Sequence, residues 1–222
     1  MSYVPVMLNV SDRKILIIGG GEAAAKKTRN LIAHSERILV VASEFSREFS
    51  RLRVEKVTAR LKSPDEVEKY LDDRSIVIIA TDDVRLNEGL EKICREKDIL
   101  YNRVDNNESA FIFPAVSESD GVLIAVSTRG RSPSFARFLR DILQKEAGRY
   151  TKAIPVIERV RSKVEIPNIK MRAEFFRTLL SDKEFWDLIN RKSPDEAFNF
   201  SLEKARSFLE KRKRLPDNVE FF

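Results

Sequence analysis

Residues 15–24 hold the feature that most constrains the fold of this chain: an apolar run, three consecutive glycines and the start of a helical pattern. Ile15–Ile18 has the β-branched and apolar character of a buried strand. The spacing Gly19-x-Gly21-x-x-Ala24 matches the dinucleotide-binding fingerprint with alanine at its third position. In such a turn, backbone N–H groups and the positive end of the helix dipole face an anion. The pattern predicts a nucleotide site, and the alternative is a glycine-rich turn with no ligand.

Strand and helix signals alternate through the first half of the chain. Continuous apolar runs such as 75–80 are typical of parallel strands buried on both faces. Ser63 precedes Pro64 and Glu66, which predicts a capping box at the start of a helix. The predicted strands are 4–10, 15–18, 37–42, 54–61, 75–80 and 99–102, and the predicted helices are 23–32, 45–52, a segment from 63 and 84–97. This order predicts an α/β fold with a Rossmann-like, doubly wound parallel sheet.

The pattern changes after residue 110. Residues 111–115 and 122–127 have the composition of strands, and Ser132-Pro133 predicts the capped start of a helix. From residue 148 onward the signal is helical. We therefore expect a small α+β region after the parallel sheet, followed by a helical C-terminal domain.

Composition limits the class of protein. Hydrophobic residues make up 42% and charged residues 34%, as in a soluble globular protein, and no apolar run approaches the roughly 20 residues of a membrane helix. The N-terminus carries no secretion signal pattern, so we expect a cytoplasmic protein. The single cysteine, Cys94, excludes an intramolecular disulfide and is predicted to be a buried core residue. The net charge of +6 has three possible explanations: binding of nucleic acid, binding of a polyanionic small molecule, or solubility.

The sequence holds no metal-binding motif. The only histidine, His34, has no partner at ligand spacing and is predicted to be a surface or capping residue. We therefore expect no structural zinc site and no Ser-His-Asp catalytic apparatus.

Candidate ligand-binding residues follow the predicted strands, because a doubly wound sheet presents ligands at the carboxyl ends of its strands. After the strand at 37–42, Ser43 stands where an NAD-binding fold usually has an acid for the ribose hydroxyls, and Glu44 comes slightly late. No arginine follows at once to hold a 2′-phosphate, which favours NAD over NADP. Thr81 and Asp82 are predicted to face the cofactor; alternatively, the aspartates at 82 and 83 only cap the next helix.

Two further stretches hold groups for chemistry or anion binding. Asp105 follows the strand at 99–102 and is either a base or an ordinary turn residue. The loop 127–134 combines hydroxyl groups, Arg129, Arg131 and the start of a helix. That combination suits an anion site as well as a plain strand-to-helix connection.

Several longer motifs extend over residues 3–145. In chain order they are Tyr3-Val4-Pro5-Val6-Met7-Leu8, Gly19-Gly20-Gly21-Glu22-x-Ala24 with Lys26-Lys27, Ala80-Thr81-Asp82-Asp83-x-x-Leu86-Asn87, Asn102-x-Val104-Asp105, Phe111-Ile112-Phe113-Pro114-Ala115 and Ala125-Val126-Ser127-Thr128-x-Gly130-x-Ser132-Pro133-x-x-Ala136-Arg137. Together they resemble the precorrin-2 dehydrogenase/sirohydrochlorin ferrochelatase family, which includes the N-terminal half of bacterial siroheme synthase. The combination is far more specific than the glycine fingerprint alone.

The resemblance implies an NAD-dependent enzyme that oxidises precorrin-2, a tetrapyrrole with eight carboxylates, to sirohydrochlorin. In bifunctional members Fe²⁺ is then inserted to give siroheme. The family's key aspartate falls on Asp105, which would assist proton removal as hydride leaves for the nicotinamide, or accept pyrrole protons in the second reaction. The predicted cofactor contacts are Gly19, Gly20, Gly21, Glu22, Ala23, Ala24, Ser43, Thr81 and Asp82, and the predicted substrate contacts are Ser127, Thr128, Arg129, Arg131, Ser132 and Arg137.

The resemblance also implies three parts: an NAD-binding Rossmann-like domain at 1–113, a dimerisation region at 114–147 and a helical C-terminal domain at 148–222. The implied assembly is a homodimer with no nucleic-acid or membrane partner, and precorrin-2 would come from another protein. Two residues depart from the family pattern near the predicted substrate site. Arg129 stands where many members have glycine, and Arg103 replaces a residue that is usually apolar.

Two other classes of function stay open from the residues. One is a non-catalytic NAD(H)-sensing Rossmann module whose helical tail binds a partner, which predicts NAD(H) binding without turnover. The other is a nucleic-acid-binding protein that uses the basic C-terminal segment, although acidic residues are interspersed in it. The second class predicts salt-dependent affinity for DNA or RNA.

Overall fold

The computed structural model describes residues 2–72, 75–106 and 108–213. The chain divides into two units, the first made of Met1–Phe113 with Arg129–Arg131 and the second of Pro114–Thr128 with Ser132–Phe222. Each unit has a hydrophobic core of its own.

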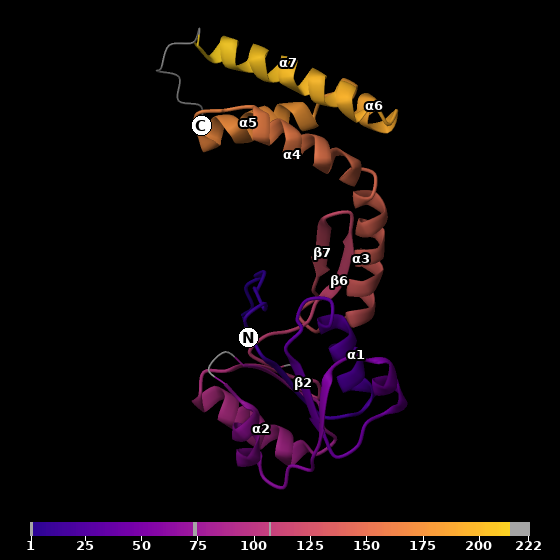
Figure 1. Cartoon of the computed structure of the whole chain (residues 1–222), viewed down its shortest axis with the longest axis vertical. Helices are drawn as coiled ribbons and strands as arrows, with labels where there is room; N and C mark the ends of the chain where they lie inside the picture. The colour runs from indigo at the N-terminus through magenta and orange to yellow at the C-terminus, as the bar shows by residue number, and fades with distance from the viewer. Residues whose placement is uncertain (1, 73–74, 107, 214–222) are drawn as a thin grey trace. The chain divides into compact units, whose positions relative to one another are not determined.

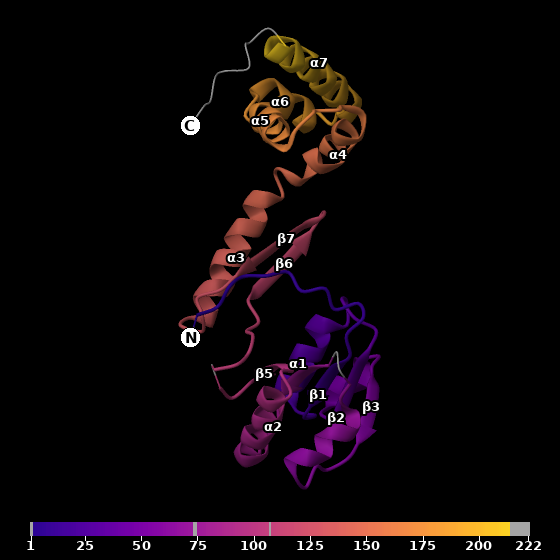
Figure 2. The same ribbon diagram turned by 90° about the vertical axis from the view of Figure 1, so that its left-hand side faces the viewer.

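The first unit is built on a five-stranded sheet, part of which is labelled in Figures 1 and 2. Its strand order is β3-β2-β1-β4-β5, and all neighbours are parallel. Its strands are β1 (Ile15–Ile18), β2 (Ile38–Ala42), β3 (Glu55–Thr58), β4 (Ile76–Ile79) and β5 (Leu100–Arg103). The chain moves outward from β1 to β2 and β3, then returns to add β4 and β5 on the other side. This is the order of a doubly wound sheet, so the predicted Rossmann-like fold is confirmed.

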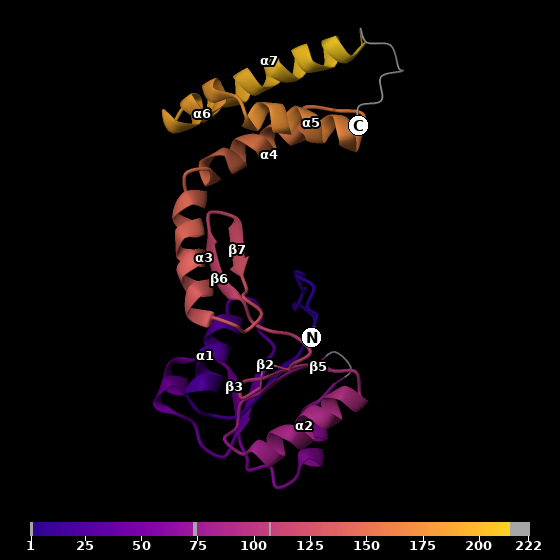
Figure 3. The same cartoon turned by 180° about the vertical axis from the view of Figure 1, so that it is seen from behind.

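Both faces of the sheet are buried. In β1, Leu16 belongs to the core on one face and Ile17 to the core on the other, because successive side chains of a strand point to opposite faces. Helix α1 (Glu22–Leu31) contributes to the core that holds Ile17, and helix α2 (Val84–Glu96) to the core that holds Leu16. The two helices lie on different sides of the sheet (Figure 3). Burial on both sides explains why these strands are continuous apolar runs without alternation.

Two 3-10 helices complete the first unit, η1 (Arg47–Arg51) and η2 (Pro64–Tyr70). The capping box predicted at Ser63 is wrong, because the Ser63 side chain makes no cap hydrogen bond. The N–H of Glu66 instead donates to the main-chain carbonyl of Ser63 at 3.3 Å, and the Glu66 carboxylate accepts from the N–H of Lys62. The tighter i→i+3 bonding of a 3-10 turn therefore occupies the N–H group that a capping hydroxyl would bind.

Two predicted strands are absent from the described part of the chain. Residues 4–10 pair with no strand of the described sheet, residues 4–9 are exposed, and Pro5 has no N–H to donate. The strand predicted at 111–115 is also wrong, because Phe111 and Phe113 pack against the core on the α1 side of the sheet. The next strand begins only at Ala115.

The second unit begins with an antiparallel hairpin of β6 (Ala115–Ser119) and β7 (Val122–Val126), which packs against α3 (Pro133–Ala147) (Figure 1). Asp120 and Gly121 form the two-residue turn with φ values of 49° and 79°. Positive φ at both positions is the geometry of a type I′ turn, whose twist matches that of the flanking strands.

A helical segment follows, and its core is partly aromatic, with Phe175 and Phe185 almost fully buried. Its elements are η3 (Thr151–Ala153), α4 (Ile154–Lys163), α5 (Ile169–Leu180), α6 (Lys183–Asn190) and α7 (Pro194–Lys213). The predicted helical C-terminal region is confirmed. The separation of a dimerisation region at 114–147 from a domain at 148–222 stays a prediction, because both lie in one unit. Over the residues described, no helix combines the length and the apolar character needed to cross a membrane.

Candidate functional site

The glycine turn joins β1 to α1 at the carboxyl end of the sheet. Gly19 has a φ of +123°, and a Cβ there would lie 2.2 Å from the carbonyl oxygen of Ala80. A Cβ on Gly20 would lie 1.8 Å from the carbonyl oxygen of Glu44. Both opposing atoms belong to the main chain and cannot swing aside, so the packing of the fold itself requires these two glycines.

Gly21 has a different environment. A Cβ there would meet no atom within 4 Å, and its φ of −76° is one that any residue adopts. Gly21 is the N-cap of α1 and has no side chain to cap the N–H groups of the first turn. The open space in front of Gly21, beside the positive end of the helix dipole, therefore fits the pyrophosphate of a dinucleotide.

The other predicted cofactor residues near this turn divide by burial. Glu22 and Ala23 are exposed in the first turn of α1, whereas Ala24 is fully buried in the core with β1. The third fingerprint position thus serves the close packing of helix against strand. Ser43 and Glu44 follow β2 and are both exposed, and a ribose contact by Ser43 stays a prediction.

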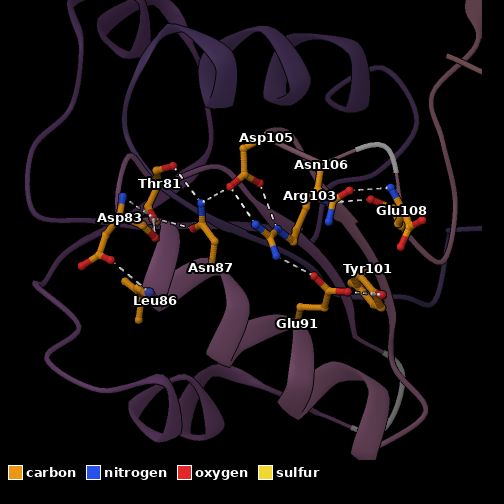
Figure 4. Close-up of polar contacts among 11 residues, drawn as sticks. Thr81, Asp83, Leu86, Asn87, Glu91, Tyr101, Arg103, Asp105, Asn106 and Glu108 are labelled. Carbon is orange, nitrogen blue, oxygen red and sulfur yellow. Dashed lines mark hydrogen bonds and ion pairs between the residues drawn. The ribbon is translucent and has the colours of Figure 1, made fainter. Parts of the chain in front are cut away.

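A chain of polar contacts runs along the carboxyl ends of β4 and β5 (Figure 4). Thr81 Oγ1 donates to Asn87 Oδ1 at 2.5 Å, and Asn87 Nδ2 donates to the Thr81 carbonyl at 3.0 Å and to Asp105 Oδ2 at 3.1 Å. Asn87 is fully buried on α2. It therefore ties the loop after β4 to the carboxylate after β5, and brings together the predicted site residues Thr81 and Asp105.

The two aspartates after Thr81 differ in role. Asp83 caps α2, since its Oδ1 accepts from the N–H of Leu86 at 3.0 Å, which confirms the capping alternative for this residue. Asp82 is exposed, and its contact with a cofactor stays a prediction.

Asp105 is held by Arg103, the residue that departs from the family pattern. Arg103 Nε donates to Asp105 Oδ1 and Nη2 donates to Oδ2, each at 2.9 Å. Arg103 Nη1 donates to Glu91 Oε2 at 2.7 Å. The side chains of Arg103 and Glu91 are only 7% and 11% exposed, so the guanidinium is a buried cation between two carboxylates.

Each charged group of this cluster stabilises the charged form of its neighbour. The hydrogen bonds from Arg103 hold the pKa of Asp105 below its usual range against the opposing effect of burial, and Asn87 adds to the lowering. Burial favours the neutral form of Glu91, yet hydrogen bonds from Arg103 and Tyr101 prevail and lower its pKa. The hydrogen bond to Asp105 raises the pKa of Arg103. All three groups are therefore charged at neutral pH.

Sequence reasoning misses the outer part of this cluster. Tyr101 donates to Glu91 Oε1 at 3.0 Å, and Arg95 pairs with the same carboxylate at 2.7 Å. One signal was present: Glu91 lies one helical turn after Asn87, on the face of α2 that is buried. An ionised side chain on the buried face of a helix requires a charged partner, and Arg103 in a strand is such a partner.

The predicted substrate loop is divided between the units. Arg129 and Arg131 belong to the first unit and are exposed, with Arg129 at a φ of 54°. In the second unit, Thr128 Oγ1 accepts from the N–H of Ser132 at 2.9 Å, and Ser132 caps α3 as predicted. Substrate binding by these residues stays a prediction, as it does for two other exposed residues of the second unit, Ser127 and Arg137.

The only histidine and the only cysteine of the sequence, His34 and Cys94, have the burial that the sequence predicts. His34 is exposed, and no group of three metal-ligating side chains exists among the described residues. Cys94, on the buried face of α2, is 2% exposed in the core, and burial raises its pKa to about 12. The prediction of Cys94 as a core residue is confirmed, and an inert thiol is the consequence.

Comparison with known families gives a match over the first unit. Residues 6–115 match a family model described as putative NAD(P)-binding. Siroheme synthase from Nitrosomonas europaea is 38% identical over 149 residues, which cover 65% of this chain and 30% of that protein. Siroheme synthase from Tolumonas auensis is 28% identical over 213 residues, which cover 93% of this chain and 44% of that protein.

A solved structure shares the fold over nearly the whole chain. The structure of SirC, precorrin-2 dehydrogenase, matches with a TM-score of 0.60 and 21% identity, covering 96% of this chain and all of that one. The chain spans less than half the length of these siroheme synthases.

Proposed function

The chain belongs to the precorrin-2 dehydrogenase and siroheme synthase family, and from that membership we propose that it oxidises precorrin-2 to sirohydrochlorin with NAD⁺. One observation carries the proposal: the cradle at Gly21 and the carboxylate of Asp105 follow strands β1 and β5 at the same edge of one parallel sheet. Thr81 follows β4, which lies between these two strands. In a doubly wound sheet, this edge holds the dinucleotide.

The reaction removes a hydride and a proton from the tetrapyrrole. Bound NAD⁺ supplies the hydride acceptor. The backbone at Gly21 and the N-terminus of α1 would hold the pyrophosphate, and Thr81 would be a further cofactor contact. The ionised Asp105 would stabilise the positive charge that develops on the ring as the hydride leaves, and the proton would then pass to water.

The substrate carries eight carboxylates, and cationic groups on this chain suit it. The net charge is +6, which gives a favourable potential for a polyanion. The hydroxyl, N–H and guanidinium groups of the predicted substrate loop are donors that carboxylates accept. We propose Ser127, Thr128, Arg129, Arg131, Ser132 and Arg137 as substrate contacts.

Insertion of Fe²⁺ into sirohydrochlorin is a separate activity. Both oxygens of Asp105 already accept hydrogen bonds from Arg103. A fixed guanidinium beside this carboxylate repels an incoming divalent cation and weakens the carboxylate as an acceptor of pyrrole protons. Dehydrogenation alone is therefore the activity that we propose.

The proposal is tested with purified protein, precorrin-2 and NAD⁺, following the absorbance of NADH and of sirohydrochlorin. Asp105→Asn is expected to lower the rate about 100-fold or more while NAD⁺ binding stays within about twofold, because the carboxylate acts on the reacting ring and not on the cofactor. Asp65→Asn, an acid-to-amide change at an exposed position of η2, is the matched control and keeps the wild-type rate.

The outcomes separate the candidate functions. If the protein binds NAD⁺ but does not turn over verified substrate, the proposed dehydrogenase function is wrong and the NAD(H)-sensing function is supported. If Asp105→Asn turns over substrate at the wild-type rate, Asp105 has no catalytic role. Addition of Fe²⁺ to the sirohydrochlorin formed shows whether a chelatase activity accompanies the first reaction.

We also propose a homodimer formed through the hairpin β6–β7 and α3. Large apolar side chains on these elements are exposed: Val116, Leu123, Phe135, Phe138 and Ile142. Exposed apolar groups gathered on neighbouring elements are typical of protein interfaces. Light scattering should give twice the chain mass of 25.6 kDa for the wild type and 25.6 kDa for Phe138→Asp. A wild-type monomer would overturn this proposal. The cytoplasm is the proposed location, because the reaction depends on NAD⁺.

A further inference from the structure

We propose that the buried pair of Glu91 and Arg103 is a positioning device for Asp105, which fixes the orientation of the carboxylate and keeps it ionised. The inference rests on the proposed function of the site, since it assigns to Asp105 the role of a permanent anion beside the substrate. It adds two residues, neither of which touches substrate or cofactor, to the groups on which the reaction depends.

The geometry of the contact fixes the carboxylate. Two parallel N–H···O bonds of 2.9 Å join the planar guanidinium of Arg103 to both oxygens of Asp105 (Figure 4). A bidentate pair of this kind restrains rotation of the carboxylate as well as its distance. Asn87 Nδ2 adds a third bond to Oδ2, from the opposite element α2.

The guanidinium is itself held on its other side. Glu91 Oε2 accepts from Arg103 Nη1 at 2.7 Å, and Glu91 Oε1 accepts from Tyr101 and pairs with Arg95. The main chain of Arg103 is fixed too, because its N–H donates to Ser109 Oγ at 2.9 Å. The arginine therefore has no freedom to release Asp105 and turn toward another partner.

The exposed fraction of the side chain is larger at Asp105 than at the two residues that hold it, Arg103 and Glu91. The side chains of Arg103 and Glu91 are 7% and 11% exposed, whereas that of Asp105 is 27% exposed. A purely structural ion pair needs no such gradient. Here the two holding groups are inside the protein and the group that they hold faces outward, at the edge where the sheet presents its ligands.

In the described part of the chain, the charged and titratable groups linked to Asp105 through Arg103 and Glu91 lie on two elements. Arg103 and Tyr101 lie on β5, and Glu91 and Arg95 lie on α2. The two cations balance the two carboxylates, so the cluster contains compensated charge. The hydrogen bonds from Arg103 and Asn87 lower the pKa of Asp105, so the carboxylate is ionised at neutral pH.

Four variants test the device: Arg103→Leu, Arg103→Lys, the double change Arg103→Leu with Glu91→Leu, and Arg29→Leu as the control. The double variant removes both buried charges together, so it stays informative if Arg103→Leu alone does not fold. Arg29 is matched because it also pairs with a glutamate, Glu48, but on the exposed surface of α1.

Three readouts are measured: kcat, the KM for NAD⁺, and the pH dependence of kcat on its acid side. In Arg103→Leu and in the double variant, kcat is expected to fall roughly 10- to 100-fold with an unchanged KM for NAD⁺, because a displaced carboxylate loses alignment with the substrate. The ionised form is the active one, so activity is lost as pH falls through the Asp105 pKa. The acid limb should therefore move to higher pH.

Arg103→Lys separates the two parts of the inference. A lysine restores the positive charge, so the acid limb should return toward that of the wild type. It cannot form the bidentate fork, so kcat should stay low. Arg29→Leu should match the wild type in all three readouts.

A measurement without substrate makes failure of the inference distinct from failure of the proposed function. The pKa of the Asp105 carboxyl, followed by carbon NMR, is expected to lie below the usual range in the wild type and to rise in the double variant. If it does not rise, the inference is wrong whatever the enzyme does. If it rises but kcat and the acid limb of an active enzyme do not change, the pair is structural only.

Discussion

Gly20 and Gly21 are adjacent glycines in one turn, and the structure gives them opposite requirements. A Cβ on Gly20 would lie 1.8 Å from a main-chain carbonyl oxygen, whereas a Cβ on Gly21 would have no atom within 4 Å. We therefore predict that Gly20→Ala unfolds the protein or weakens it severely. Gly21→Ala should leave the fold intact and weaken the binding of NAD⁺.

The magnitudes follow from these distances. Forcing a methyl group at Gly20 against main-chain atoms should cost about 3 kcal/mol, the upper end of the range for overpacking. At Gly21, alanine is the poorer N-cap by up to about 1 kcal/mol, but it restricts the unfolded chain by about 0.4–1 kcal/mol in compensation. The free energy of unfolding of Gly21→Ala should therefore lie within about 1 kcal/mol of the wild type.

At Gly21 the substitution should change the affinity for NAD⁺ and not the stability. The new methyl group would occupy the space through which phosphate oxygens approach the N–H groups of the first turn of α1. Loss of one hydrogen bond to a charged oxygen is worth about 1.5–3 kcal/mol. The Kd for NAD⁺ should rise about tenfold or more.

Two measurements check this pair of variants. Urea denaturation gives the free energies of unfolding, and calorimetric titration with NAD⁺ gives the affinities. If Gly21→Ala binds NAD⁺ within twofold of the wild type, the pyrophosphate does not lie at the N-terminus of α1. If Gly20→Ala is as stable as the wild type, the packing argument is wrong.

Further predictions concern stability and its dependence on pH. Val40→Ala, at a fully buried position of β2, should lower the free energy of unfolding by about 2–3 kcal/mol, while Val6→Ala, 75% exposed, should change it by less than about 0.5 kcal/mol in the same denaturation assay. Burial, and to a smaller extent the neighbouring charge of Lys26, lowers the pKa of Lys27 from 10.5 to about 8. Between these two pH values the unfolded chain binds more protons at Lys27 than the folded chain does, so the free energy of unfolding should rise with pH. The rise should be smaller in Lys27→Met. The folded pKa of Asp105 lies below its usual value, so its contribution to stability is present above about pH 4 and is lost as pH falls; acid titration of Asp105→Asn should show a shallower loss than the wild type.

Much of the fold follows from local patterns. The apolar runs at 15–18 and 75–80 predict β1 and β4, and the structure confirms both within one residue at each end. The failures are instructive. Residues 4–10 have strand composition but no partner in the described sheet, and a strand is stable only when its N–H and C=O groups are paired.

The sequence by itself determined the glycine spacing, the order of the five parallel strands along the chain and the position of Asp105 after the last of them, because each depends on residues close together in the chain. Only the tertiary structure decided which glycines serve the fold and which serves a ligand, since that depends on atoms of Ala80 and Glu44. It also decided the partners of Asp105. Glu91 and Arg103 belong to different elements, and a charge pattern does not identify its partner until folding removes both groups from water and makes the pairing necessary.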